Sequence, residues 1–370
     1  MEQLLIGFIG LTWKHVIMFG IGIILIYLAI AKEYEPVLLL PIGFGALLCN
    51  IPFSSAIGPE GPLTVLHHAG ILTEIFPVLI FVAIGAMCDF APMLQNPILM
   101  MFGAAAQFGI FATIVFAAFL GFDIKEAASI GIIGAADGPT TIYVATKFAP
   151  HLLAPLSVAA YSYMSLVPII QPPVIKALTT KKERSLFMPV KQGAPVSRMV
   201  RISFPIAVTL VAGIIAPISV ALIGMLMFGN LLKECGVVER LSKSAQEELA
   251  NIVTLLLGIT IGASMTADEF LNAKTIMVMA MGIVAFVFDT AGGVLFAKTL
   301  NLFIKEKINP MIGACGISAF PMSARVIAKM ALAENKRNYI IMHAIGANVS
   351  GQIGSIIAGG MVLALVAGMM

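Results

Sequence analysis

The chain has 370 residues, of which 59% are hydrophobic and only 11% are charged, and its formal net charge is +3. Because an ordinary soluble domain carries about 25% charged residues, this composition excludes a soluble protein with a conventional surface. The basic residues fall in loops, and Walker A and dinucleotide-binding glycine signatures are absent. These features argue against nucleic-acid binding and against direct use of ATP or NAD.

Apolar stretches long enough to enter a membrane recur along the whole sequence, which predicts an all-α polytopic membrane protein. In the first half they lie at 14–31, 36–52, 71–88, 97–122, 127–147 and 152–178. In the second half they lie at 202–217, 218–232, 250–265, 275–303, 309–332 and 339–369. The first twelve residues have no basic region or small-residue cleavage site, so we expect no cleavable signal there.

A polar stretch divides the sequence into two halves. From 179 to 201 the hydrophobic pattern stops, and basic residues gather there. The positive-inside rule places such a stretch in the cytoplasm. We therefore predict a leading transmembrane span at 1–35, a first repeat at 36–178, a basic cytoplasmic linker at 179–201 and a second repeat at 202–370.

Two short segments, one in each half, are versions of one another. Gly134–Lys147 and Gly316–Lys329 share glycine, proline and lysine positions at an offset of 182 residues, and Gly85 matches Gly262 at an offset of 177. Apart from the leading span, the two halves hold five and six of these stretches, and we count about five hydrophobic elements in each repeat. Because five is an odd number, the second half is predicted to enter the membrane upside down, giving inverted repeats. Interrupted hydrophobic segments in corresponding halves are typical of the broken or re-entrant helices that hold an ion or substrate near the midplane of transporters.

Asp137, in the first of these segments, is the main candidate for an ion site. A carboxylate at membrane depth costs several kcal/mol unless it faces a partner or a cavity. The glycines and the proline beside it permit a non-helical backbone with free carbonyl oxygens, and Thr140 and Thr141 add hydroxyls. This all-oxygen set suits a hard cation such as Na⁺. The alternative is a kinked helix in which Asp137 only caps a half-helix.

Arg325 is the arginine of the second segment, and Asp289 is a further acid within an apolar stretch. The planar fork of an arginine suits a carboxylate or a carboxylated ligand. A structural ion pair of Arg325 with Asp137 or Asp289 explains it equally well. Asp289 has no counterpart in the first half, and it either pairs with a basic residue or binds a second ion.

Other polar residues in the apolar stretches are secondary candidates. Asn309 and Gly313 open the second segment, although a helix cap and a close-packing position explain them too. A polar patch of Asn348, Ser350, Gln352 and Ser355 in the last apolar run predicts a lined cavity. Tyr163, which matches Asn348 at an offset of 185, either hydrogen-bonds a structural partner or delivers a proton.

These motifs together resemble the β subunit of the sodium-pumping biotin-dependent decarboxylases. That family serves oxaloacetate, methylmalonyl-CoA, glutaconyl-CoA and malonate decarboxylases. The resemblance covers essentially the whole chain and is most specific in the Asp-Gly-Pro-Thr and Phe-Pro-Met-Ser-Ala-Arg blocks. It is carried by Gly-Ala-Ala-Asp-Gly-Pro-Thr around Asp137, by Tyr163, Asn309 and Gly313, by Ser-Ala-Phe-Pro-Met-Ser-Ala-Arg from Ser318 to Arg325, and by Gly-Ala-Asn-Val-Ser-Gly around Asn348.

The resemblance implies a specific reaction and specific residue roles. A membrane subunit of this kind decarboxylates carboxybiotin at its cytoplasmic side and drives Na⁺ outward. The residues that would take part in catalysis are Asp137, Tyr163, Ser318 and Arg325. Arg325 would also bind the carboxybiotin. The residues that would hold Na⁺ are Asp137, Asn309, Gly313, Ser318 and Asn348.

The resemblance also implies a setting for the chain. It is expected to be a multi-pass protein of the inner, cytoplasmic membrane of a bacterium, surrounded by lipid. Its expected partners are a carboxyltransferase subunit, a biotin-carrier domain that presents carboxybiotin, and a small single-span membrane subunit. An elevator-like fold and a homotrimer are expected as well. The main alternative is a Na⁺-coupled secondary carboxylate transporter, and a non-catalytic membrane anchor ranks below it.

Overall fold

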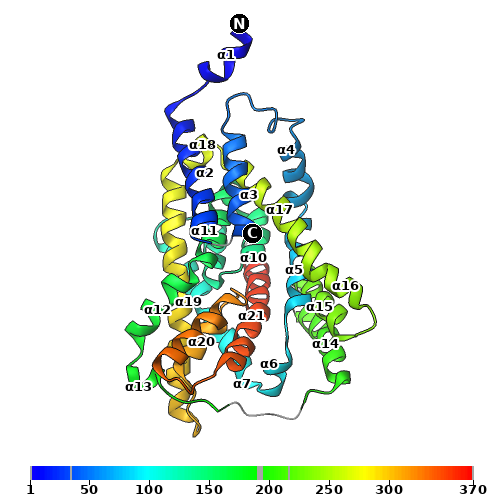
Figure 1. The fold of residues 1–370 in the computed structure, drawn as a ribbon, viewed down its shortest axis with the longest axis vertical. Coiled ribbons are helices and arrows are strands. Elements are labelled where there is room, and N and C mark those ends of the chain that lie inside the picture. The colour runs from blue at the N-terminus through cyan, green and yellow to red at the C-terminus, as the bar shows by residue number, and fades with distance from the viewer. Residues whose placement is uncertain (1, 34–35, 190–194, 216, 369–370) are drawn as a thin grey trace.

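The computed structural model describes residues 2–33, 36–189, 195–215 and 217–368. All regular elements of these residues are helices, and the described ranges contain no strand (Figure 1). The predicted all-α class is therefore confirmed.

The first half of the chain is built from helices that follow the predicted apolar stretches closely. Its elements are α1 (Glu2–Ile9), α2 (Trp13–Ala31), α3 (Pro36–Cys49), α4 (Pro62–Leu66), η1 (His67–Leu72), α5 (Ile75–Met87), α6 (Ala91–Gln95), α7 (Ile98–Ala106), α8 (Phe108–Phe119), α9 (Ile124–Gly131), η2 (Ile132–Ala135), α10 (Gly138–Phe148), η3 (Pro150–Leu152), α11 (Leu153–Ser165), α12 (Val167–Leu178) and α13 (Lys181–Arg184).

The second half ends in two long helices. Its elements are α14 (Arg198–Ile215), η4 (Pro217–Ser219), α15 (Val220–Glu234), α16 (Glu239–Ser244), η5 (Ala245–Leu249), α17 (Ala250–Ala263), α18 (Ala267–Phe270), α19 (Ala273–Phe303), η6 (Pro310–Gly316), α20 (Met322–Glu334) and α21 (Ile341–Gly368). Here η1 and η5 are π-helical turns and the other η elements are 3₁₀ helices.

Six helices among the described residues are long and apolar enough to cross a membrane, and the number reaches eight when each of two bent helix pairs is counted as one span. One bent pair corrects the predicted continuous stretch 152–178, because α11 and α12 meet at an angle of 69°. Pro168, in the first turn of α12, lacks the amide hydrogen needed to continue a helix. The stretch is therefore interrupted where the sequence pattern suggested a single span.

The two halves exchange contacts in a reciprocal way. Gly85 of α5 packs against α15 of the other half, where an added Cβ would lie 1.8 Å from the Leu226 carbonyl oxygen. The matching Gly262 of α17 packs against α3, where an added Cβ would lie 2.1 Å from the Ile42 oxygen. Small residues at such positions let helix backbones approach closely. The contacts support internal repetition, and the inversion of the second repeat stays a prediction.

Two asparagines form a second reciprocal pair. Asn50, at the end of α3, donates through Nδ2 to the carbonyl of Met265, at 2.8 Å, just after α17. Asn230 of α15 donates to the carbonyl of Cys88, at 3.3 Å, just after α5. Met265 and Cys88 are 177 residues apart, which is the offset of the matched glycines. In each half, an asparagine side chain therefore hydrogen-bonds the backbone at the end of a helix of the other half.

A second group of helices packs around α19. This 31-residue helix contacts α7, α8, α11, α12 and both 3₁₀ segments η2 and η6, while α21 packs on α7, α20 and η6. In Figure 1 the red α21 and the orange α20 lie beside each other in front of α7. Both η2 and η6, in which the two matched segments begin, belong to this group.

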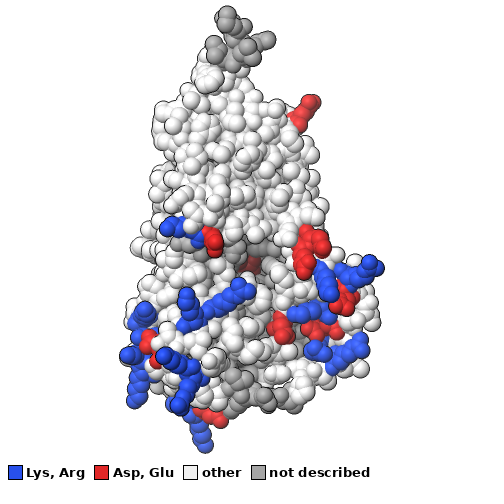
Figure 2. Space-filling view, in the orientation of Figure 1, with Lys and Arg blue, Asp and Glu red and all other residues white. Residues whose placement is uncertain are grey.

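Basic side chains gather toward one end of the molecule. In Figure 2 the Lys and Arg side chains lie in the lower half, near α13, α20 and the α14–α16 side, whereas the upper part of this face is almost uncharged. By the positive-inside rule, the basic end is the one expected on the cytoplasmic side.

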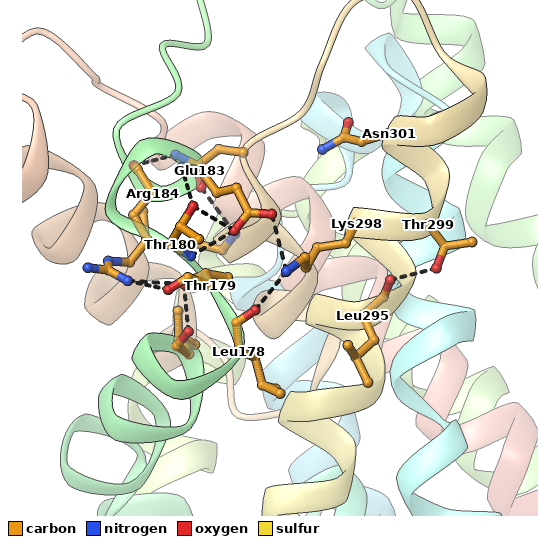
Figure 3. Close-up of polar contacts among 12 residues, drawn as sticks. Leu178, Thr179, Thr180, Glu183, Arg184, Leu295, Lys298, Thr299 and Asn301 are labelled. Carbon is orange, nitrogen blue, oxygen red and sulfur yellow. Dashed lines mark hydrogen bonds and ion pairs between the residues drawn. The ribbon is translucent and has the colours of Figure 1, made fainter.

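The beginning of the predicted linker is firmly attached to the helices at this basic end (Figure 3). Thr180 caps α13, and its backbone N–H donates to Glu183 Oε2 at 2.7 Å. Lys298 of α19 contacts Glu183 Oε1 at 3.2 Å and donates to the Leu178 carbonyl at 3.0 Å. Arg184 donates to Glu334 of α20 at 2.7 Å. This part of 179–201 is therefore an ordered turn that joins α12, α19 and α20.

We predict that Gly85→Ala destabilises the protein by about 1–3 kcal/mol, because its methyl group would overlap the α15 backbone and force the helices apart. Thermal unfolding in detergent measures the effect. Gly20→Ala in α2 is the matched control, since no atom lies within 4 Å of its added Cβ. An equal response of both variants would contradict the close-packing role of Gly85.

We also predict that α13 loosens at acidic pH. Burial alone raises the pKa of Glu183, but hydrogen bonds from Thr180 and Lys298 together hold that pKa below its usual value of 4.5. A lowered folded-state pKa means that Glu183 contributes its stabilisation above about pH 4.5 and loses it as the pH falls through the folded-state value. After correction for the pH dependence of intrinsic amide exchange, the protection of residues 180–186 against hydrogen exchange should therefore fall at acidic pH in the wild type. In Glu183→Gln this protection should be low already at neutral pH and should not fall further.

Candidate cation site

Asp137 lies at a break between two helices. The chain runs through α9 into the 3₁₀ helix η2, takes a left-handed conformation at Ala136 (φ 51°) and is extended at Asp137. A left-handed residue other than glycine costs about 1–2 kcal/mol, so surrounding contacts must hold it. Asp137 then caps α10, and its Oδ1 accepts from the Thr140 N–H at 3.0 Å. The predicted helix break at Asp137 is confirmed. Asp137 also caps a helix, which is the alternative role that the sequence allowed.

Capping occupies only one of the two carboxylate oxygens. Oδ2 of Asp137 accepts hydrogen bonds from the hydroxyl of Ser355 at 2.6 Å and from that of Ser318 at 3.2 Å. The two hydroxyl oxygens lie 3.1 Å apart, and Thr141 adds a third hydroxyl that donates to the Asp137 carbonyl at 2.7 Å. All of these residues are buried. The cap is therefore also the centre of a buried cluster of oxygens.

Ser318 belongs to the second matched segment, which is also interrupted. After η6 the chain is non-helical from Ile317 to Pro321, and α20 then begins at Met322. The Ser318 N–H donates to the Ala135 carbonyl at 2.8 Å. The two segments that the sequence matched thus meet backbone to backbone at their breaks.

Helix α21 completes the cluster with one face. Asn348, Gln352 and Ser355 follow each other by four and three residues, a spacing that places them on one side of a helix. The amide nitrogens of Asn348 and Gln352 donate to the carbonyls of Ile317 and Ser318. Their amide oxygens are buried, and within the described residues neither has a hydrogen-bond partner. Oxygens left unpaired in this way are what a desolvated cation needs.

The arrangement fits Na⁺ as a transported ion. Asp137 supplies a negative charge, and the hydroxyls of Ser318 and Ser355 and the unpaired oxygens of Asn348 and Gln352 supply neutral ligand atoms. Hard cations prefer such oxygen sets. Gln352 and Ser355 were recognised in the sequence only as part of a polar patch, because nothing along the chain shows that they meet Asp137.

Asn309 lies just before η6 and Gly313 lies in its middle. Asn309 caps the beginning of η6, and its Nδ2 donates to the carbonyls of Arg184 and Leu186 at 2.8 and 3.1 Å. Seven residues of 3₁₀ helix span about 14 Å, so Asn309 is separated from Ser318 by the length of η6. Gly313 packs against the backbone of Gly293 in α19. Their role as ion ligands stays a prediction, and the contacts give each of them a structural role.

The two tyrosines of α11 differ in what they contact. The Tyr163 hydroxyl donates to the carbonyl of Met279 in α19. The Tyr161 ring instead lies against Gly138, where an added Cβ would be 2.3 Å from two of its carbons, and within the described structure its buried hydroxyl has no partner. Tyr161 is therefore the tyrosine packed against the start of α10, beside Asp137. Sequence reasoning selected Tyr163, because a single helix does not reveal which side faces the carboxylate.

Arg325 lies in the first turn of α20, a short way after Ser318. Its side chain is exposed, and none of the described residues forms a hydrogen bond or an ion pair with it. The alternative of an ion pair with Asp137 or Asp289 is thus not found. From this turn α20 continues to Glu334, which pairs with Arg184 at the basic end. The guanidinium is consequently available to a ligand.

The fold and the site define a polytopic helical membrane protein in which two interrupted segments cross at a buried carboxylate, as in ion-transporting proteins with broken helices. Comparison with known proteins identifies the family. The family model of the Na⁺-transporting oxaloacetate decarboxylase beta subunit matches residues 14–366, and the chain belongs to this family.

Relatives from several kinds of decarboxylase match nearly the full chain. The methylmalonyl-CoA decarboxylase subunit beta of Veillonella parvula is 50% identical, over 97% of this chain and 95% of the relative. The glutaconyl-CoA decarboxylase subunit beta of Acidaminococcus fermentans is 48% identical, over 98% and 96%. The probable oxaloacetate decarboxylase beta chain of Vibrio cholerae is 42% identical, over 98% of both chains. The resemblance proposed from the sequence motifs is therefore confirmed.

We predict that Ser355→Ala weakens Na⁺ binding about tenfold. Its hydroxyl makes the shortest contact to Asp137, hydrogen bonds to charged groups contribute about 1.5–3 kcal/mol, and 1.4 kcal/mol corresponds to a factor of ten. The measurement is the Na⁺ concentration that half-saturates the rise in melting temperature, with choline as the replacing ion. Ser264→Ala removes a hydroxyl bonded only to its own helix and should leave the value unchanged. Equal values for both variants would contradict the site.

Proposed function

We propose that this chain decarboxylates carboxybiotin and uses the release of CO₂ to drive Na⁺ outward across the cytoplasmic membrane of a bacterium. The family supplies the general activity, a Na⁺-transporting decarboxylase. The observation that carries the proposal is the buried oxygen cluster at Asp137, formed where the two interrupted segments meet. Such a site suits Na⁺, and nothing in a simple membrane anchor requires it.

The reaction makes chemical demands that the described residues are suited to meet. In decarboxylation the bond between the biotin nitrogen and the carboxyl carbon breaks, the electron pair stays on nitrogen, and nitrogen takes up one proton as CO₂ leaves. We propose that Arg325 binds the carboxylate of carboxybiotin, since its guanidinium is exposed and has no partner among the described residues. α20 would then connect this substrate to the cation cluster through Ser318, four residues before Met322.

The energetics of the coupling are reasonable. Moving one charge across a membrane potential of 100 mV costs about 2.3 kcal/mol. We propose that Na⁺ is held at Asp137 while it faces the cytoplasm, and that loss of CO₂ accompanies its release to the other side. The movement would be elevator-like, with the helices around α19 and α21 shifting against the rest. The roles of Tyr163, Asn309 and Gly313 in this cycle are part of the proposal.

The proposed partners follow from the same chemistry. A biotin-carrier domain would bring carboxybiotin to the basic end of the molecule, a carboxyltransferase subunit would load it, and a small single-span subunit would join them to this chain. A homotrimer is the proposed assembly. The relatives belong to decarboxylases that differ in substrate, and the acid that is decarboxylated upstream is selected outside this chain.

The test adds carboxybiotin to the purified complex and follows its loss while Na⁺ is varied. We expect loss that depends on Na⁺ in the wild type and falls by at least about 10²-fold in Asp137→Asn, which removes the charge but keeps the shape. Asp123→Asn, which changes an exposed acid that caps α9, is the matched control and should remain active. Loss of carboxybiotin that depends on neither Na⁺ nor Asp137 would overturn the proposed coupling. No loss at any Na⁺ concentration would overturn the decarboxylase proposal and favour a Na⁺-coupled carboxylate transporter.

A further inference from the structure

Asp289 is a second buried acid, distinct from the cluster at Asp137. It lies near the middle of α19, sixteen residues after Ala273 and fourteen before Phe303. At 1.5 Å per residue these distances are about 24 and 21 Å, so Asp289 lies deep in the membrane. Its exposed fraction is 0%, and neither of its carboxylate oxygens has a hydrogen-bond partner in the described chain.

Within the described residues, no positively charged side chain forms an ion pair with Asp289. The ion pairs found among the described residues all use other acids. Of the elements packed on α19, α7, α8 and η2 contain no titratable side chain. On α11, Tyr163 donates to the Met279 carbonyl and the Tyr161 ring lies against Gly138. On η6 and α12, Cys315 contacts Ser323 and Lys176 is exposed. On α9, Lys125 and Glu126 lie in the first turn, and Glu126 pairs with Lys274.

The backbone of α8 packs closely against Asp289 at Gly109. Gly109 lies so near that an added Cβ would be 2.5 Å from Asp289 Oδ1. One turn along α19, Gly293 packs directly on the Gly313 backbone of η6. These glycines leave little room for a hydration shell around the carboxyl. Within the described residues no hydroxyl hydrogen-bonds the Asp289 carboxyl, in contrast to Asp137.

The two buried acids thus differ in what surrounds them. Asp137 accepts hydrogen bonds from an N–H and two hydroxyls, and such bonds favour the ionised form of a carboxyl group. No hydrogen bond of normal geometry reaches the Asp289 carboxyl from the described residues, and the Gly109 N–H of α8 is a nearby donor that favours the ionised form only in part. A buried carboxylate with so little compensation is so costly that the group becomes neutral instead. A sodium ion also needs several oxygen ligands, whereas a proton needs only one.

We propose that Asp289 is a proton-binding site, separate from the sodium-binding site at Asp137. In this division Asp137 is ionised and binds Na⁺, and Asp289 is a neutral acid that carries one proton at the centre of α19. The proposed decarboxylation consumes one proton per CO₂ released, so a protonated acid inside the membrane has a defined use. That use rests on the proposed function, but proton binding itself does not.

Infrared difference spectroscopy tests the assignment without any turnover. A neutral carboxylic acid has a carbonyl stretching band that shifts in heavy water, and ionised acids lack this band. At neutral pH and saturating Na⁺ we expect the band in the wild type and in Asp137→Asn, and its loss in Asp289→Asn. Added Na⁺ should leave it unchanged. A band that persists in Asp289→Asn, or that disappears from the wild type when Na⁺ is added, would overturn the proposal.

A second measurement on the same samples separates proton binding from folding and from sodium binding. The Na⁺-induced rise in melting temperature should survive in Asp289→Asn and disappear in Asp137→Asn. If Asp289→Asn does not fold, Asp289→Ala replaces it, because removing an unpartnered buried polar group is well tolerated. Loss of the sodium response in a folded Asp289 variant would place both acids in one site and overturn the division. The infrared band does not depend on turnover. A failed decarboxylation assay would therefore contradict the proposed function without contradicting proton binding at Asp289.

Discussion

The constraint on which the structure depends is the burial of one carboxylate where two interrupted helices cross. Asp137 ends one break and Ser318 lies in the other, and the Ser318 N–H bonds the Ala135 carbonyl. A carboxylate in a low-dielectric interior must be compensated. Here the compensation comes from the start of α10, from the second break and from a face of α21. The site therefore forms only when segments far apart in the sequence have come together.

Much of this arrangement was predictable, because a membrane imposes simple rules on a sequence. Apolar runs defined nearly every long helix, and the Gly/Pro pattern around Asp137 indicated the break that is found there. The glycine match between Gly85 and Gly262 also anticipated equivalent packing positions. These features are local or periodic, so they can be recognised in a single amino-acid sequence.

The remainder depends on which faces of helices meet, and sequence alone does not contain this information. Ser355 was one polar residue among several, and only the packing of α21 brings its hydroxyl to Asp137. Tyr161 and Tyr163 are two residues apart and point to different helices, so the choice between them required the structure. Asn309 looked like a ligand, yet its amide holds the chain at Arg184 and Leu186.

The central claim is that the ion at Asp137 moves because carboxybiotin loses CO₂. The most direct measurement follows radioactive sodium uptake and carboxybiotin loss together in inside-out vesicles that contain the complete complex. The account predicts that both occur in a fixed ratio in the wild type and that both cease in Asp137→Asn. Carboxybiotin loss that continues in Asp137→Asn at the wild-type rate, or sodium uptake without it, would contradict the account.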